Sequence, residues 1–151
     1  MRRPLIILFS LALFASVAVA DSAGKILKVL PQYLDLQGRT ALAPSLYERD
    51  AYQAQLLAKR DLCSGLVFNV QWKSRNAANL KVYVEARGVV RNSNLQTFVW
   101  EKPVTRHGWF SQWEKITVTG EQFKQLETLT AWRVTLWDGT KLLGEQKSFL
   151  W

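Results

Sequence analysis

The feature that most constrains this chain is an alternation of apolar and more polar residues in two stretches near its middle. In the first stretch, every second residue belongs to one apolar set: Leu66, Phe68, Val70 and Trp72. Residues 80–86 repeat the pattern. A period of two places successive side chains on opposite sides of a β-strand, so each stretch predicts a strand with one buried face. Because the polar residues 74–79 predict a turn, we expect the two strands to form an antiparallel pair.

Further β-rich runs raise the expected number of strands to about seven. They lie at residues 26–36, 95–100, 113–119, 132–137 and 141–151. Pro31 cannot donate a hydrogen bond to a neighbouring strand, which places the first of these runs at a sheet edge. Asp138 and Gly139 favour the tight turn of a hairpin between the last two runs.

Two short helices are expected between the strands. Residues 45–48 fit a capping box, and Asp50 is an alternative N-cap for a helix over residues 51–62. The side chains expected to face the sheet are those of Tyr52, Leu56 and Leu57. Residues 119–122 show the same capping pattern and predict a second helix.

These elements predict an all-β chain that folds as an antiparallel β-sandwich of about seven strands with two short helices. Over residues 66–151 the architecture resembles the immunoglobulin and fibronectin type III group, with Trp72 placed like the core tryptophan of a middle strand. The cysteine pair of true immunoglobulin domains is missing, because Cys63 is the single cysteine. The resemblance therefore concerns architecture alone.

Three segments resemble those of small uncharacterised exported bacterial proteins. They are residues 44–53, 132–137 and the C-terminal 146–151. The resemblance spans most of the chain and implies no activity.

The N-terminus predicts export. Arg2 and Arg3 precede an apolar run at residues 5–20, which ends in Ala18-Val19-Ala20, the small-x-small pattern that signal peptidase accepts. We expect a cleavable signal peptide over residues 1–20, followed by a single domain over residues 21–151. The run is shorter than the roughly 20 residues of a membrane-spanning helix, although a retained anchor is the alternative. The mature protein is expected in the periplasm or outside the cell, without stable membrane insertion.

The chain is basic, with a formal net charge of +8. Its lysines and arginines are spread along the sequence, so we expect a solvated surface with a cationic bias. Such a surface attracts anionic cell-wall polymers or lipid headgroups weakly. A nucleic acid partner is not expected, because little nucleic acid is present outside the cytoplasm.

Few residues offer chemistry. His107 is the only histidine and lies in an expected loop, and Cys63 is read as a small apolar residue at the start of a strand. Two of the carboxylates Asp35, Glu48 and Asp50 could in principle act together as the catalytic pair of a glycosidase. Glu48 and Asp50, however, are explained as helix-cap residues. The sequence therefore predicts no enzyme activity, no metal site and no cofactor.

Aromatic residues stand above the background, with seven tryptophans in 151 residues. Trp72 and Trp132 fall on apolar faces and should be core. The candidate binding residues fall in a loop-like stretch or on a polar strand face: Trp109, Phe110, Trp113 and Trp137. They could cover the ends of the sandwich, stack on sugar rings or contact a protein.

The resulting hypothesis is an exported, non-enzymatic binding or assembly protein of the cell envelope, whose partner is another envelope protein or a glycan. One alternative is a carbohydrate-binding or cell-wall-binding module that uses its exposed tryptophans. A remote alternative is a small outer-membrane β-barrel, because the last run is amphipathic and ends in Phe149 and Trp151.

Overall fold

The structure is a computed structural model that describes residues 23–75, 77–90 and 94–151. The predicted signal peptide, residues 1–20, lies outside the described residues. Within them, no helix has the length and apolar character that crossing a membrane requires.

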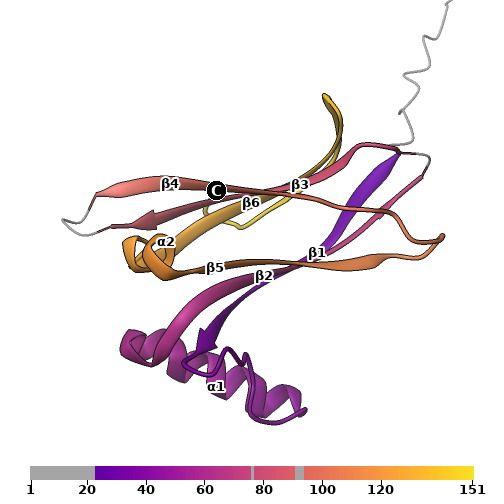
Figure 1. Ribbon diagram of the computed structural model, residues 1–151. Coiled ribbons are helices and arrows are strands. Elements are labelled where there is room, and N and C mark those ends of the chain that lie inside the picture. The colour runs from indigo at the N-terminus through magenta and orange to yellow at the C-terminus, as the bar shows by residue number, and fades with distance from the viewer. Residues whose placement is uncertain (1–22, 76, 91–93) are drawn as a thin grey trace, which may run out of the picture.

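The described residues form seven strands in two antiparallel sheets that pack face to face (Figure 1). The three-stranded sheet has the order β1-β2-β5, and the four-stranded sheet has the order β4-β3-β6-β7. The strands are β1 (Gly24–Asp35), β2 (Cys63–Ser74), β3 (Leu80–Val89), β4 (Leu95–Pro103), β5 (Gln112–Thr119), β6 (Thr128–Asp138) and β7 (Lys141–Lys147). The helices are α1 (Leu46–Ala58), the 3-10 turn η1 (Arg60–Leu62) and α2 (Gly120–Gln125). The predicted β-sandwich with two short helices is confirmed.

The expected pairing of β2 with β3 is wrong. β2 pairs with β1 and β5, whereas β3 pairs with β4 and β6 in the other sheet. The alternation nevertheless identified the buried faces, since Phe68 of β2 and Val84 of β3 are both 0% exposed. β2 and β3 therefore belong to different sheets, and their two apolar faces meet across the core rather than along one sheet.

The edge position of β1 and the final hairpin are confirmed. β1 carries Pro31 at the edge of the three-stranded sheet, and Gly139 adopts a φ of 57° in the turn between β6 and β7. The return strand ends at Lys147, not at Trp151 as expected. There the chain bends back, and the ring of Trp151 lies 4.0 Å from the guanidinium carbon of Arg87.

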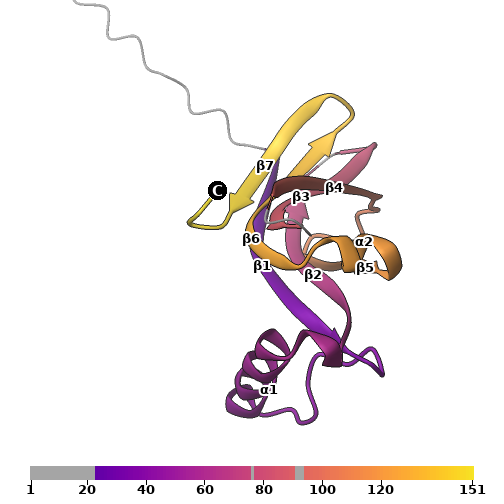
Figure 2. The ribbon, with the colours of Figure 1, turned by 90° about the vertical axis from the view of Figure 1, so that its left-hand side faces the viewer.

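Helix α1 begins earlier than the Asp50 alternative would place it, with Ser45 as its N-cap, and it ends at Ala58. The Ser45 side chain makes no capping hydrogen bond, so the capping box does not form. Leu56 is buried as expected, whereas Leu57 is 62% exposed, so its predicted orientation is wrong. The helix lies along the free edge of β1, where the Gln53 side chain bonds to the Tyr33 backbone, and below both sheets in the view of Figure 1 (Figures 1 and 2).

Both open sides of the sandwich are bridged. On one side β1 approaches β7 so closely that a Cβ on Gly144 would lie 3.0 Å from the backbone nitrogen of Ile26. On the other side the Lys102 ammonium of β4 contacts the Glu114 carboxylate of β5 at 2.5 Å and donates to the Lys115 carbonyl at 3.1 Å. These contacts restrict access to the sheet edges, which leaves the two outer faces as the larger accessible surfaces.

Candidate functional site

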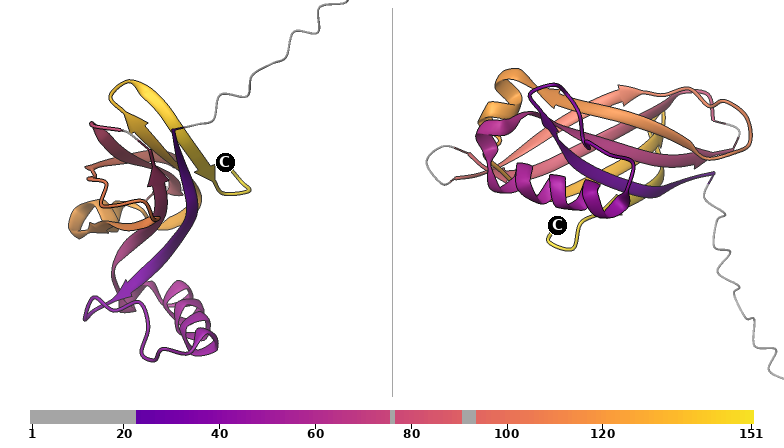
Figure 3. Two further views of the ribbon diagram at one scale, coloured as in Figure 1. Left: turned by 90° about the vertical axis from the view of Figure 1, so that its right-hand side faces the viewer. Right: turned by 90° about the horizontal axis from the view of Figure 1, so that it is seen from below.

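A groove of about 910 Å³ lies on the outer face of the three-stranded sheet. Side chains of β1, β2 and β5 form its floor, and the segment at 38–41 together with the start of α1 forms a wall. The right-hand view of Figure 3 shows the strands and the helix from this side. Its charged lining residues are Lys28, Arg39, Arg49 and Lys115, and its aromatic residue is Trp113. We call this surface the basic groove.

The wall of the groove is held by Asp35, at the end of β1. Its buried carboxylate accepts hydrogen bonds of 2.8 Å from the backbone N–H groups of Gln37 and Arg39, from the Arg39 guanidinium and from the Tyr52 hydroxyl. Burial alone would raise the pKa of Asp35, but these donors outweigh it and lower the pKa to about 2. Asp35 is therefore ionised at neutral pH and fixes the segment against α1.

Gln53 of α1 fastens the same wall to the sheet. Its side-chain oxygen accepts from the Tyr33 backbone N–H at 2.8 Å, and its side-chain amide donates to the carbonyls of Tyr33 and Thr40 at 2.9 and 2.8 Å. Because the Gln53 side-chain amide makes all three hydrogen bonds, it ties β1, the wall segment and α1 together and holds the wall of the groove in place.

The floor combines apolar and amide groups. Val67 is only 3% exposed although it projects from the outer face of β2, because the wall covers it. Leu30 is half-buried beside it, and half of the Trp113 side chain stays exposed. The Asn69 amide donates to the Gln32 side-chain oxygen at 2.9 Å. This bond uses only one of the hydrogen-bonding groups of each side chain, so both amides can also bond to a ligand in the groove.

The cations of the groove are not neutralised equally. Arg39 is paired with Asp35 at 2.8 Å, but Lys28, Arg49 and Lys115 form no ion pair with the described residues. Among the described residues, no carboxylate lines the groove. A concave surface with charges of one sign concentrates oppositely charged ligands.

The predicted binding residues do not form one site. Trp109 and Phe110 are 96% and 86% exposed in the loop between β4 and β5, and Trp113 lies in the basic groove. Trp137 lies on the outer face of the four-stranded sheet, where its ring centroid is 6.4 Å from that of Tyr83. That ring lines a separate hollow of about 490 Å³ with Glu85, Arg133 and Thr135.

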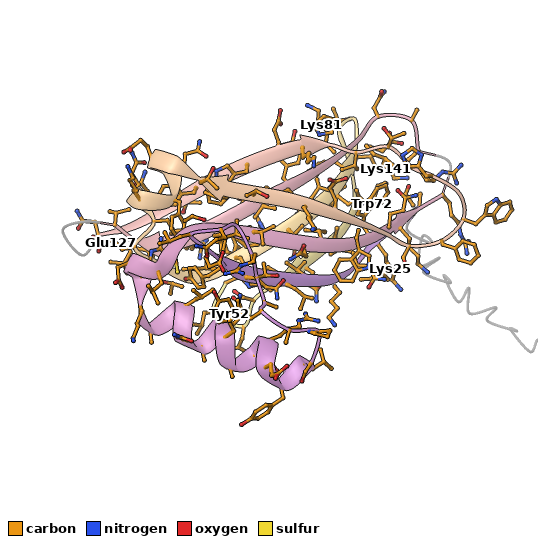
Figure 4. All side chains as sticks on the ribbon, turned by 60° about the horizontal axis from the view of Figure 1, so that its bottom comes forward. Lys25, Tyr52, Trp72, Lys81, Glu127 and Lys141 are labelled. Carbon is orange, nitrogen blue, oxygen red and sulfur yellow. The ribbon has the colours of Figure 1, made fainter. Side chains whose placement is uncertain are left out.

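The two tryptophans expected in the core lie on the core face. Trp72 is 1% exposed between the sheets (Figure 4), and Trp132 is partly buried against the core.

Sequence reasoning missed the three unpaired cations, Lys28, Arg49 and Lys115. They are far apart in the chain, so the sequence showed no basic cluster. The signal that could have found two of them is their position, because Lys28 and Lys115 both occupy outer-face positions of strands in the same sheet.

The remaining chemistry-bearing residues lie apart. Glu48 and Asp50 are exposed on α1, His107 is exposed in the β4–β5 loop, and the Cys63 thiol donates to the Leu56 carbonyl at 3.3 Å. Burial raises the pKa of the Cys63 thiol, which disfavours the reactive thiolate. No group of three or more histidine, cysteine, aspartate or glutamate side chains able to hold a metal ion occurs in the described part of the chain.

No family model, curated protein or solved structure matches this chain. What its surfaces can bind is therefore inferred from their residues and shapes.

Proposed function

We propose that the protein is an exported binding module of the cell envelope that holds an acidic polysaccharide in the basic groove. The observation that carries this proposal is the set of three cations, Lys28, Arg49 and Lys115, that lack an ion-pair partner among the described residues and surround a floor with a half-exposed tryptophan. The predicted signal peptide supports an extracytoplasmic location, where envelope polymers are available and nucleic acid is scarce.

The lining groups match the chemistry of an acidic sugar chain. The exposed face of Trp113 offers a flat apolar surface against which a sugar ring can stack. Asn69 and Gln32 offer amides for hydroxyl groups, and the cations offer charge-assisted hydrogen bonds to carboxylate, sulfate or phosphate groups. The groove is open to solvent, so a polymer can enter along its length without threading.

Binding without catalysis is part of the proposal. The described lining of the groove supplies cations, amides and hydroxyls, and it contains neither histidine nor carboxylate to act as a general base. The strand orders β1-β2-β5 and β4-β3-β6-β7 are consistent with an immunoglobulin-like or fibronectin type III-like module. Domains of this architecture serve many functions, so the groove rather than the fold supports the assignment.

The test is affinity electrophoresis in gels that contain polygalacturonate, dextran or polyacrylate. Polygalacturonate supplies sugar rings with carboxylates, dextran supplies rings without charge, and polyacrylate supplies charge without rings. We expect retardation to be strongest in polygalacturonate and to weaken as salt is added. Trp113→Ala should reduce it, whereas Trp137→Ala, on the opposite sheet, should not.

Two results would count against the proposal. Equal retardation by polyacrylate, unchanged in Trp113→Ala, would show a charge effect without sugar recognition. Equal retardation by dextran would show that the cations play no part.

A further inference from the structure

The loop between β4 and β5 carries the most exposed aromatic pair among the described residues. Trp109 is 96% exposed and its neighbour Phe110 is 86% exposed. The loop turns at Gly108, whose φ of 80° requires a residue without a Cβ, and it projects beyond the ends of the strands. Two large adjacent apolar side chains held in water on a projecting loop mark an interaction site rather than a packing element.

Cations surround this loop. Trp109 lines a small pocket of about 160 Å³ together with Lys25, Lys73 and Arg75. No carboxylate lines the described part of that pocket, and the exposed Arg106 lies three residues before Trp109. Figure 4 shows Lys25 at this end of the sandwich and Glu127 toward the opposite end.

The described chain begins at the same place. Ala23 lines the pocket with Trp109, and the start of β1 lies beside the β4–β5 loop in Figure 1 and in the right-hand view of Figure 3. The apolar run at residues 5–20 therefore joins the domain at this end. If that run enters the membrane during export, as a signal or as an anchor, it brings Trp109 and Phe110 close to the bilayer surface.

We infer that this end of the sandwich is a membrane-docking tip. Trp109 and Phe110 enter the interfacial region of a bilayer that contains anionic lipid, and the ammonium groups of Lys25 and Lys73 contact the headgroup phosphates. Tryptophan suits this position because its ring is apolar while its indole N–H can bond to water or headgroups. A projecting tip fits a deformable surface, whereas a rigid partner would need a matching hollow.

The tip is separate from the basic groove and does not depend on the proposed function. Trp113 lies on β5 in the groove, whereas Trp109 and Phe110 lie in the loop that precedes that strand. Variants of the tip and variants of the basic groove can therefore each be measured for vesicle binding and for polygalacturonate binding.

The test uses the exported protein, with its N-terminus established by intact mass. Vesicles of phosphatidylcholine and phosphatidylglycerol contain a fraction of lipid with brominated acyl chains, which quench tryptophan fluorescence on contact. We expect quenching that is largely lost in Trp109→Phe and retained in Trp113→Phe. This measurement works with or without a retained N-terminal segment, because the difference between wild type and Trp109→Phe reports on one of the seven tryptophans.

Flotation gives the second measurement for protein whose N-terminal segment has been removed. The double variant Trp109→Ser/Phe110→Ser should bind anionic vesicles about tenfold more weakly. Lys25→Gln/Lys73→Gln should lower binding about 30-fold, from about 1 kcal/mol for each cation near an anionic surface. Phe149→Ser, a change at a fully exposed residue near the C-terminus, is the matched control and should have no effect.

Three results would overturn the inference. They are quenching that is equal in wild type and Trp109→Phe, absence of quenching in the wild type, and a dimer in solution that Trp109→Ser/Phe110→Ser dissociates. Loss of vesicle binding in the tip variants, with polygalacturonate binding intact, would support membrane docking by the tip and show that it is independent of the basic groove. The reverse result would refute the tip and leave the basic groove standing.

Discussion

The outer faces of the two sheets use their charges differently. On the four-stranded sheet, Arg133 contacts Glu85 at 2.6 Å and Glu145 at 3.8 Å, and Lys81 lies 3.6 Å from Glu101. On the three-stranded sheet, Lys28 and Lys115 have no ion-pair partner among the described residues. Arg133 and Lys81 are therefore paired within the molecule on one face, whereas Lys28 and Lys115 on the other face remain available to an external anion.

Aromatic residues follow the same division. On the four-stranded sheet the Trp137 indole donates to the Thr135 hydroxyl at 2.9 Å, and the Trp151 ring covers the guanidinium groups of Arg87 and Arg133. On the three-stranded sheet half of Trp113 remains in solvent. The comparison teaches that the exposed aromatic ring of the three-stranded sheet lies among cations without an ion-pair partner in the described part of the chain, which is the pattern expected of a binding surface.

The largest expected effect concerns ligand affinity. Lys28→Gln/Lys115→Gln should weaken binding to polygalacturonate about 30-fold at low salt, from about 1 kcal/mol for each lost contact. The matched control, Lys81→Gln/Lys147→Gln, removes the same charge from the other face and should change affinity by less than about twofold. Calorimetric titration measures both variants. Equal losses would mean that net charge alone drives binding and would erase the distinction between the faces.

The second effect concerns the wall of the groove. Asp35→Asn should lower the free energy of unfolding at pH 7 by about 2 kcal/mol, because it removes a buried charge that accepts four hydrogen bonds. Denaturant unfolding measures the difference. A loss of stability below about 0.5 kcal/mol would show that the wall is not held by this carboxylate.

The same carboxylate predicts a pH dependence. Its pKa is lowered from the ordinary 3.8 to about 2 in the folded protein, so its contribution is complete above about pH 4. As the pH falls from about 4 toward 2, the unfolded state takes up the proton while the Asp35 carboxylate of the folded state stays ionised, so the contribution is lost. The gap between wild type and Asp35→Asn should therefore narrow over this interval, and a gap that stayed constant would contradict the assignment.

A smaller effect separates the ion pairs of the two faces. Arg133→Ala should destabilise the fold by about 1 kcal/mol, because it removes contacts with Glu85, Glu145 and the Trp151 ring. Lys115→Ala should leave stability nearly unchanged, since that ammonium group has no ion-pair partner among the described residues. Thermal unfolding at low and high salt measures both. Equal losses of stability in the two variants would contradict the difference between the two faces.

The smallest expected effect is a gain. Lys25 and Lys73 are directly opposite in the β1–β2 register, and like charges at such positions repel. Lys73→Glu should therefore stabilise the fold by about 0.5 kcal/mol at low salt. The control is the double variant Lys25→Glu/Lys73→Glu, which restores like charges at the same pair and should lose the gain. A gain that persists in the double variant would point to net charge rather than to this pair.

The alternation of apolar and polar residues predicted which face of each strand is buried, but not which strands pair with each other. It correctly placed Phe68 and Val84 in the core, yet β2 and β3 belong to different sheets. The period of two depends only on which side of a strand is buried, whereas pairing depends on how the chain crosses between sheets. The same limit applies to Val67, whose burial results from the wall segment and not from its own strand.

The candidate site was predicted in part. The loop position of Trp109 and Phe110 was predicted, whereas their exposure was one of several alternatives that the sequence left open, and the structure shows both residues exposed. The basic groove could not be predicted as a whole, because Arg49 joins Lys28 and Lys115 only through the packing of α1 against β1. Tertiary packing, rather than local spacing, brings the three charges together.

The close approach of Gly24 and Gly144 bears on the order in which the chain can fold. β1 is the first and β7 the last of the described strands, so the two ends of the described chain meet on this side of the sandwich. A nascent chain that lacks the β6–β7 hairpin has nothing to pack against β1 there. This side of the sandwich can therefore close only after the hairpin has been made, which delays completion of the fold until late in synthesis.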